Sequence, residues 1–280
     1  MLNASQKFIP IGTSPAGLCL TAANWQEVGV NTIAFYLDSL LVKPGYALLK
    51  QIQDFSQYMG WSGTVILNAS KLVANKEGVF TLTSPFDGSK LKLTYFQLIE
   101  IIQHINPKAV LLPPKTLQQF PEVWDNWSDS ITPFIAAEDL LKQELSRAHG
   151  VYINLANSSP SDIDIDHLQK WSPLPRYITG PIGLDVIQHL INEGIEWIES
   201  DEPAAAAMQG RVYSPRGLIN LVDDATEKQF ETIDAKCTCP TCAQQLTQAY
   251  LHHLFLHTPL LCQRFLIQHN VFYANKNKGK

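Results

Sequence analysis

The sequence has 280 residues, a formal net charge of −5 at pH 7 and 45% hydrophobic residues, which suits one large domain or two small ones with a sizeable core. This balance excludes a general electrostatic attraction to nucleic acid, so any RNA contact has to come from a local patch. There is no apolar run of membrane-spanning length and no recognisable secretory leader, so we expect a cytoplasmic protein without a membrane partner.

Short apolar runs alternate with helical segments along most of the chain. Eight runs are expected to form strands: 8–13, 31–36, 64–67, 109–112, 131–135, 151–155, 176–179 and 195–199. Helices are expected over 46–59, 138–148 and 184–193, and Thr21 is expected to cap an earlier helix. Eight βα units predict a TIM (β/α)8 barrel of the α/β class, although an open doubly wound sheet gives a similar pattern.

The most informative stretch follows these units. Cys237, Cys239 and Cys242 lie within six residues, followed by a helical pattern over 243–268. Three thiolates at this spacing, with a distant imidazole, favour a tetrahedral zinc ion. A disulfide is disfavoured because the close cysteines are odd in number and no leader directs the chain to an oxidising compartment. Four protein ligands leave no position for water, so the zinc is expected to be structural.

The fourth ligand is open on this reasoning. His252, His253, His257 and Cys262 all lie on the expected helix, whereas His269 lies past its end. We favour His269, because the chain can fold back there onto the cysteines.

Three segments together carry a family resemblance: the cysteine cluster, the run 248–254 (Gln-Ala-Tyr-Leu-His-His-Leu), and His269 followed by Asn270. They resemble the zinc subdomain of the tRNA-guanine transglycosylases, or queuine tRNA-ribosyltransferases, which exchange guanine in tRNA for queuine or a 7-deazaguanine precursor. The resemblance implies a TIM barrel, here 1–230, with a C-terminal zinc-binding subdomain, here 231–280. It also implies the zinc ligands Cys237, Cys239, Cys242 and His269.

The resemblance extends over most of the chain. Between 114 and 131, however, this chain largely lacks an additional segment that the family has. The other matching segments are 8–12, 43–45, 58–61, 87–89, 175–177, 194–195 and 217–220.

The resemblance also implies two reactive positions at the C-terminal ends of barrel strands. Glu199 stands where the family has its nucleophilic Asp, so a carboxylate is kept but is one methylene longer. Asn68 stands where the family has its second catalytic Asp, and an amide cannot exchange a proton as a carboxylic acid does. We expect Asn68 and Glu199 to face each other at the barrel mouth, with Glu199 in the nucleophile position and Asn68 inactive.

Other family positions are altered as well. The segment 112–114 lacks the acid that reads the base, 135–137 lacks the family's glutamine, 203–210 lacks both arginines of the RNA-binding pattern, and Lys71 replaces a glycine. Because the reactive positions depart while the scaffold motifs remain, we expect a catalytically inactive homologue or accessory subunit, a pseudoenzyme of queuosine-type tRNA modification. Its expected partners are tRNA and either a full-length transglycosylase homologue or a second copy.

The alternative is an active base-exchange glycosyltransferase that uses Glu199 as nucleophile on an altered base or RNA. One further cluster, Asp162, Asp164 and Asp166, alternates with isoleucines and is interpreted as a solvated acidic face rather than a cation site.

Overall fold

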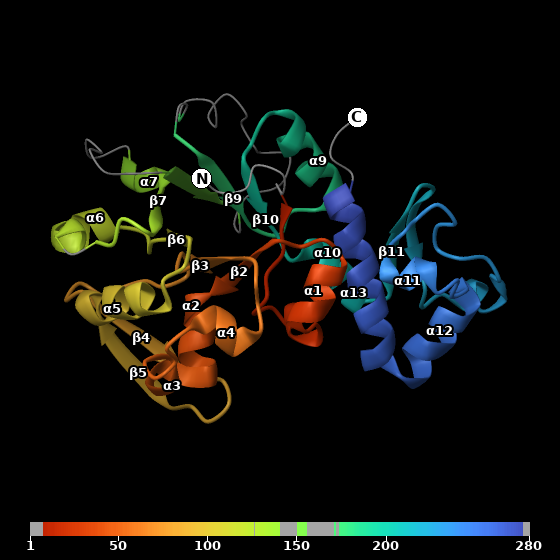
Figure 1. Ribbon diagram of the computed structural model, residues 1–280, viewed down its shortest axis with the longest axis horizontal. Helices are drawn as coiled ribbons and strands as arrows, with labels where there is room; N and C mark the ends of the chain where they lie inside the picture. Colours follow the sequence, from red (N-terminus) through yellow and green to blue (C-terminus); the bar gives the residue numbers. More distant parts are fainter. Residues whose placement is uncertain (1–7, 126, 141–149, 156–170, 172–173, 277–280) are drawn as a thin grey trace.

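Eight parallel strands form one sheet in the computed structural model, which describes residues 8–125, 127–140, 150–155, 171 and 174–276 (Figure 1). The strand order is β1-β10-β9-β8-β7-β6-β3-β2. All eight strands that the sequence predicted are present: β1 Phe8–Ile9, β2 Thr32–Tyr36, β3 Thr64–Asn68, β6 Ala109–Leu111, β7 Thr132–Ala136, β8 Gly150–Asn154, β9 Arg176–Thr179 and β10 Trp197–Glu199.

The two edge strands meet just beyond β1. Ile11 forms a parallel bridge with Ala34 of β2. The Ala34 amide donates to the Pro10 carbonyl at 3.0 Å, and the Gly12 amide donates to the Ala34 carbonyl at 2.8 Å. These bonds join β1 to β2, so the sheet is a nearly closed TIM-type barrel and the open doubly wound sheet is excluded.

Side chains that alternate along the strands divide the core into two parts. One set fills the barrel interior: Ile9, Ala34, Ile66, Ala109, Leu111, Phe134, Ala136, Tyr152 and Tyr177. A second and larger cluster lies between the strands and the surrounding helices. The barrel is therefore packed through its centre, and the reactive groups are to be sought at its ends.

The helices around the barrel are mostly short. They are α1 Ala22–Glu27, α2 Leu37–Leu40, α3 Tyr46–Leu49, α4 Phe55–Met59, α5 Tyr95–Ile105, α6 Thr116–Gln119, α7 Ala137–Leu140, α9 Leu184–Asn192 and α10 Glu202–Met208. Thr21 caps α1 as predicted, since its side chain accepts from the Asn24 amide. α9 matches the helix predicted over 184–193. Of the helix predicted over 138–148, only the first residues, in α7, lie within the described part of the chain.

The single helix predicted over 46–59 is wrong. The structure has α3 and α4 instead, separated by 50–54. Asp54 accepts from the Gln57 amide and so caps a new helix, which ends at Gly60 in the left-handed conformation. A local capping bond therefore divides a segment whose composition suggested one helix.

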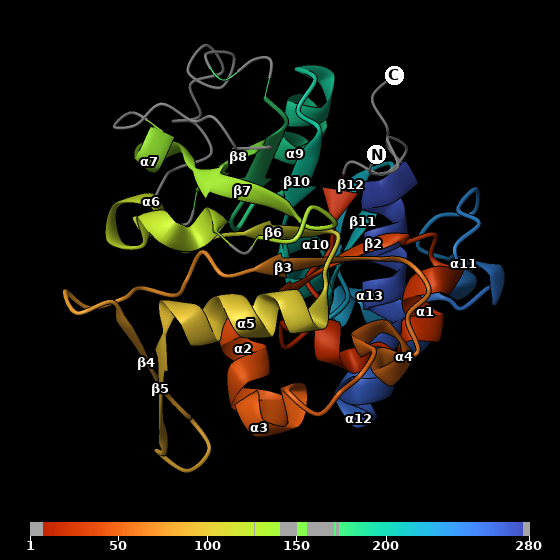
Figure 2. The same cartoon turned by 60° about the vertical axis from the view of Figure 1, so that its left-hand side comes forward.

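Two antiparallel hairpins, which the sequence analysis did not predict, extend the barrel. The first, β4 Val79–Thr83 and β5 Lys90–Thr94, lies between β3 and α5 in the chain and projects away from the barrel (Figure 2). The second, β11 Arg211–Ser214 and β12 Gly217–Asn220, follows α10.

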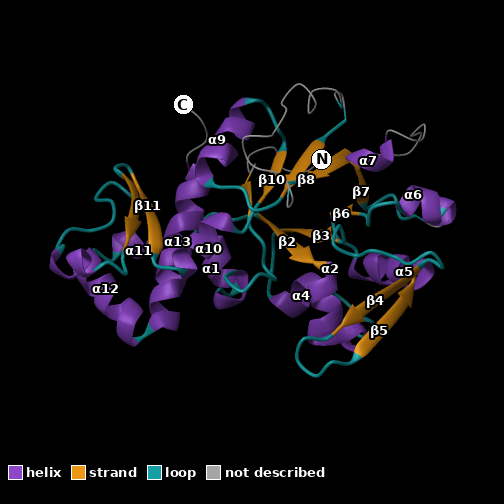
Figure 3. Ribbon diagram, turned by 180° about the vertical axis from the view of Figure 1, so that it is seen from behind, coloured by secondary structure: helices purple, strands orange, loops and turns teal. Residues whose placement is uncertain are grey.

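The chain ends in three helices, α11 Pro240–Ala243, α12 Gln248–His257 and α13 Pro259–Lys276. The uninterrupted helix predicted over 243–268 is therefore wrong. Pro259 has no amide hydrogen to continue α12, and it suits the first turn of a new helix. α13 lies beside α10 and β11 in the views from both sides (Figures 1 and 3).

The division of the chain at residue 230 stays a prediction. α13 packs on α10 of the expected barrel part, so the two expected parts share a contact surface. None of the described helices has the length and the hydropathy that a bilayer crossing requires.

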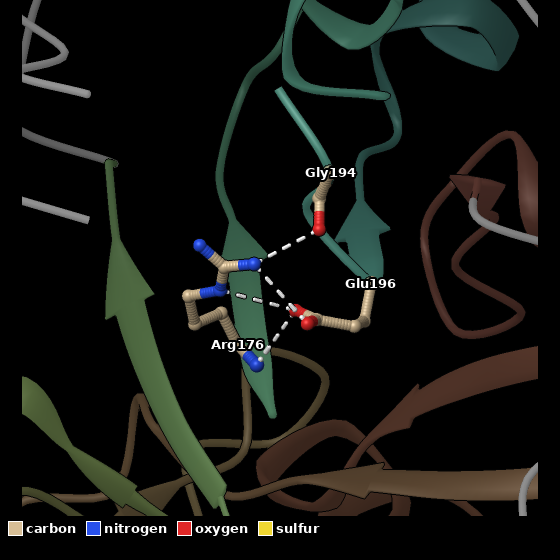
Figure 4. Close-up of polar contacts among 3 residues, drawn as sticks. All are labelled: Arg176, Gly194 and Glu196. Carbon is tan, nitrogen blue, oxygen red and sulfur yellow. Dashed lines mark hydrogen bonds and ion pairs between the residues drawn. The ribbon is translucent and has the colours of Figure 1, made fainter. Parts of the chain in front are cut away.

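Arg176 stabilises the N-terminal end of β9 (Figure 4). Its Nε and Nη2 atoms each lie 3.2 Å from a different carboxylate oxygen of Glu196, its Nη2 donates to the Gly194 carbonyl at 2.9 Å, and its backbone amide donates to the same carboxylate at 3.0 Å. The arginine side chain is mostly buried. Paired, charge-assisted bonds of this kind fix geometry as well as contributing energy.

We expect Arg176→Met to lower the free energy of unfolding by about 1–3 kcal/mol. The substitution leaves the Gly194 carbonyl without its donor and the Glu196 carboxylate with only the backbone amide of residue 176. Urea unfolding followed by circular dichroism measures this change. Lys50→Met is the control, because it removes the exposed Lys50–Glu100 pair. An exposed pair contributes little, so the control should stay near the wild-type value. Equal losses in the two variants would contradict a structural role specific to Arg176.

Candidate functional site

The described residues contain one compact cluster of metal-ligating side chains, Cys237, Cys239, Cys242 and His269, whose ligand atoms all lie within 4.8 Å of one another. His269 Nδ1 lies 3.8, 3.4 and 3.3 Å from the Sγ atoms of Cys237, Cys239 and Cys242 respectively. Cys239, Cys242 and His269 are buried and Cys237 is half-buried. The sequence prediction of these four residues as one ligand set is confirmed as a spatial cluster.

Local structure explains how the three cysteines converge. Cys239 is the N-cap of α11, where its Sγ accepts from the Cys242 amide at 3.3 Å. Pro240 then begins the short helix that carries Cys242. A Cys-Pro-x-Cys turn thus brings two thiolates onto one side of the chain, with Cys237 in the preceding loop.

These distances fit a zinc ion. Zn–S bonds of about 2.3 Å and a Zn–N bond of about 2.0–2.1 Å in a tetrahedron place the ligand atoms about 3.5–3.8 Å apart. The other imidazole nitrogen, Nε2, lies 2.8 Å from the Tyr213 carbonyl. Donation of the Nε2 proton to that carbonyl leaves the Nδ1 lone pair for the metal, which is the usual arrangement around a zinc ligand. With four protein ligands the site is closed, so its role is structural.

The ligand His269 is positioned differently from what the sequence suggested. It lies inside α13 rather than past the end of a helix, because that helix begins only at Pro259. Among the alternatives, His252 Nδ1 lies 2.7 Å from the Leu221 carbonyl and the Cys262 thiol donates to the Leu251 carbonyl. His253 and His257 are exposed. None of these four side chains belongs to the cluster.

Asn270, next to His269, is a residue for which the sequence analysis assigned no role. It is fully buried. Its Oδ1 accepts from the Tyr213 amide at 3.1 Å, and its Nδ2 donates to the carbonyls of Pro203 and Arg211 at 2.9 Å each. Asn270 therefore attaches α13 to both α10 and β11. Only the position of Asn270 beside the metal-ligating histidine signalled this role.

A second group of polar side chains lies at the C-terminal ends of β3, β9 and β10. Asn68 Nδ2 donates to Glu199 Oε1 at 2.8 Å, and both side chains are fully buried. The expectation that Asn68 and Glu199 face each other is confirmed. Their catalytic roles stay predictions.

The Glu199 carboxylate has further partners that the sequence analysis missed. Thr179 Oγ1 donates to its Oε1 at 2.6 Å, and the Tyr177 hydroxyl donates to its Oε2 at 2.7 Å. Burial raises the pKa of the Glu199 carboxyl, whereas bonds from Thr179, Tyr177, Asn68 and Tyr36 oppose that rise. Both oxygens of Glu199 are thus occupied by donors from neighbouring strands.

Asn68 is held in one orientation. Its Oδ1 accepts from the Ser70 amide at 2.9 Å, so its Nδ2 is the end that faces Glu199. Asn68 therefore acts here as a hydrogen-bond donor to a carboxylate, a role that an ionised aspartate could not fill.

Tyr36 and Lys71 lie next to this group. The Tyr36 hydroxyl lies near enough to the Glu199 carboxyl for each group to affect the pKa of the other. The Lys71 ammonium lies 3.7 Å from the centroid of the Tyr36 ring. An open cavity of about 1130 Å³ lies at this end of the barrel, and Lys71 is among the residues that line it. Neither Asn68 nor Glu199 lines the cavity. Lys71 thus lines the cavity and also lies against the Tyr36 ring.

Two more acids lie after the strand ends. Asp139 is buried, and its two carboxylate oxygens accept from the Lys115 amide at 2.8 and 3.0 Å. Asp201 accepts from Ser14 Oγ at 2.5 Å, and burial raises the pKa of its carboxyl to about 6. The sequence analysis missed both, although each acid follows a barrel strand within three residues. The earlier acidic group, Asp162, Asp164 and Asp166, lies outside the described residues.

Comparisons with known proteins agree with this geometry. A family model described as queuine tRNA-ribosyltransferase matches residues 165–277. A queuine tRNA-ribosyltransferase of Thermotoga petrophila is 23% identical over 308 residues, covering 94% of this chain and 82% of the relative. Those of Blochmanniella pennsylvanica (23% identical; 96% and 85% covered) and Methylacidiphilum infernorum (21% identical; 96% and 85% covered) are similar over almost the whole chain.

We expect one zinc ion per chain in protein purified without chelator, and we expect Cys239→Ser to release it. Because a closed metal site contributes its binding energy to folding, the variant should also melt at a lower temperature. Elemental analysis and thermal unfolding measure the two effects. Cys19→Ser is the control, since Cys19 is half-buried and lies outside the cluster. Full zinc content in Cys239→Ser would contradict this ligand assignment.

Asp201 predicts a pH effect on stability. An aspartate has a pKa of about 3.9 in the unfolded chain, against about 6 here, so the folded state holds its proton more tightly. The tighter proton binding by Asp201 therefore stabilises the folded state fully below pH 4, and this stabilisation is lost as the pH rises to about 6. Between pH 4 and pH 7 the wild type should lose about 1–3 kcal/mol more than Asp201→Asn. Urea unfolding at both pH values measures this difference. An equal change in the free energy of unfolding for the wild type and Asp201→Asn would disprove the effect.

Proposed function

The chain belongs to the queuine tRNA-ribosyltransferase family, and we propose that it is a member without base-exchange activity of its own that acts as an accessory subunit. The relatives it resembles are named queuine tRNA-ribosyltransferases. The family scaffold, with its barrel and its cluster of three cysteines and one histidine, is retained.

The state of Glu199 is the observation that carries this proposal. A carboxylate nucleophile needs a lone pair directed at the substrate, with the reacting atoms about 3–3.5 Å apart. Glu199 is fully buried, and both of its oxygens accept hydrogen bonds from side chains of the barrel. Attack on a ribose carbon would require these bonds to break and the buried carboxylate to become accessible to substrate.

The second catalytic position supports the same proposal. Asn68 supplies no exchangeable carboxyl proton, and both ends of its amide are engaged, one with Glu199 and one with the Ser70 backbone. General acid–base help is typically worth about 10²–10⁴ in rate. Loss of that help, added to the burial of Glu199, favours an inactive barrel mouth.

We propose a full-length transglycosylase homologue as the protein partner, with tRNA as the RNA that the pair handles. A second copy of this chain is the other partner considered. Support comes from α12 and the turn into α13, which expose large apolar side chains: Tyr250, Leu256, Leu260 and Leu261. Exposed apolar patches of this kind mark interaction surfaces when their side chains are contiguous.

The alternative function is base exchange with Glu199 as nucleophile on an altered base or RNA. One observation favours it: a carboxylate is kept at the strand ends, close to a cavity of about 1130 Å³. This function requires a conformation in which Glu199 is exposed and the bonds from Asn68, Tyr177 and Thr179 are broken.

A labelled-guanine exchange assay separates the two functions. We expect the purified protein to incorporate no guanine into tRNA, because its acid is replaced and its carboxylate is sequestered. A full-length family enzyme assayed in parallel is the positive control. Adding this protein to a limiting amount of its full-length homologue tests for an accessory effect.

The decisive variant is Glu199→Gln. If the wild-type protein alone exchanges guanine and Glu199→Gln abolishes that exchange, then Glu199 is a working nucleophile and the accessory proposal is wrong. Circular dichroism of the variant controls for loss of fold, because Glu199 also holds β3, β9 and β10 together.

A further inference from the structure

Two histidines near the end of α12 have no role in the sites described so far. His253 and His257 are both exposed, and no hydrogen bond joins either imidazole to another described residue. Their neighbours are engaged elsewhere: His252 lies 2.7 Å from the Leu221 carbonyl, and Cys262 donates to the Leu251 carbonyl. The pair is therefore free to bind a ligand from solution.

The spacing of the pair suits chelation. Residues four apart lie on the same face of a helix, one turn above the other, and two histidines at this spacing are a known zinc-binding arrangement. The ring centroids of His253 and His257 are 4.5 Å apart, with an angle of 46° between the ring planes. An ion about 2.0–2.1 Å from each nitrogen needs nitrogens about 3 Å apart. Rotation about the side-chain torsions brings rings at this separation to that distance.

We propose that His253 and His257 form a second metal site, separate from the cluster of three cysteines and His269, that binds a divalent transition metal ion through two imidazoles. Neutral imidazole suits Cu²⁺, Ni²⁺ and Zn²⁺, whereas Mg²⁺ and Ca²⁺ prefer oxygen ligands. No described acidic or cysteine side chain joins the pair as a third protein ligand. The remaining coordination positions are open to water, so this ion exchanges readily.

The location of the pair adds to the attraction for a cation. His257 is the last residue of α12, and the C-terminal end of a helix carries a partial negative charge. An ion that bridges residues 253 and 257 also fixes the last turn of α12, beside the exposed Leu256 and Leu260. Metal binding is therefore coupled to the order of the turn between α12 and α13.

The test uses zinc-loaded, full-length protein without an affinity tag, titrated with Cu²⁺ and, separately, with Ni²⁺ in a calorimeter. We expect one Cu²⁺ per chain beyond the structural zinc, with Ni²⁺ binding more weakly, following the usual order of these ions. His253→Gln and His257→Gln should each weaken Cu²⁺ binding by roughly tenfold or more, because a chelate becomes a single ligand. Electron paramagnetic resonance of the bound Cu²⁺ should show two nitrogen ligands.

Two controls make the result specific. His104→Gln removes an exposed histidine of α5 and should leave Cu²⁺ binding unchanged. Elemental analysis after the titration should still find one zinc per chain, which shows that Cu²⁺ has not displaced it. Both histidines of the pair are exposed, so the variants are expected to fold as the wild type does.

Three outcomes would overturn the proposal. They are no stoichiometric Cu²⁺ binding in the wild type, undiminished binding in the double variant His253→Gln/His257→Gln, and binding accompanied by an equal loss of zinc. The proposal does not rest on the proposed function, since neither histidine touches the barrel mouth.

Discussion

The attachment of α13 to the barrel through His269 and Asn270 is the interaction on which the C-terminal half of the structure depends. His269 faces the three thiols with one ring nitrogen and the Tyr213 carbonyl with the other. Asn270 bonds the backbones of Tyr213, Pro203 and Arg211. Both residues are fully buried, so each polar atom requires its partner. The metal cluster, β11 and α10 are thereby joined as one unit. The role of a closed metal site here is to hold these elements together.

The same requirement for paired polar groups governs the barrel mouth. A fully buried carboxylate is costly unless donors surround it, and Tyr177, Thr179 and Asn68 are those donors. Two facing carboxylates at positions 68 and 199 would repel each other, whereas an amide facing a carboxylate forms a good hydrogen bond. The loss of an acid at Asn68 thus fits the burial of Glu199. The amide at position 68 thus leaves both polar groups of the pair hydrogen-bonded within the core.

Much of the fold was predictable because it depends on local patterns. The eight strands are short apolar runs between turn formers, and the cysteine spacing alone indicated a metal cluster. The errors arose where a single bond or residue divides a regular pattern, as the Asp54 cap does between α3 and α4 and Pro259 does between α12 and α13. Such breaks depend on one residue, and the helix-forming composition around that residue does not predict them.

The sequence by itself determined the alternation of strands and helices and the three thiol ligands, because these follow from residue type and spacing. The family resemblance implied His269 as the fourth ligand and the facing pair Asn68 and Glu199. Only the tertiary structure decided that Thr179 and Tyr177 also bond to Glu199, and that Asn270 attaches α13 to α10 and β11. Those contacts join residues far apart in the chain, such as Thr179 with Glu199 and Asn270 with Pro203. Barrel closure and the packing of α13 bring these residues together, and no local pattern records that geometry.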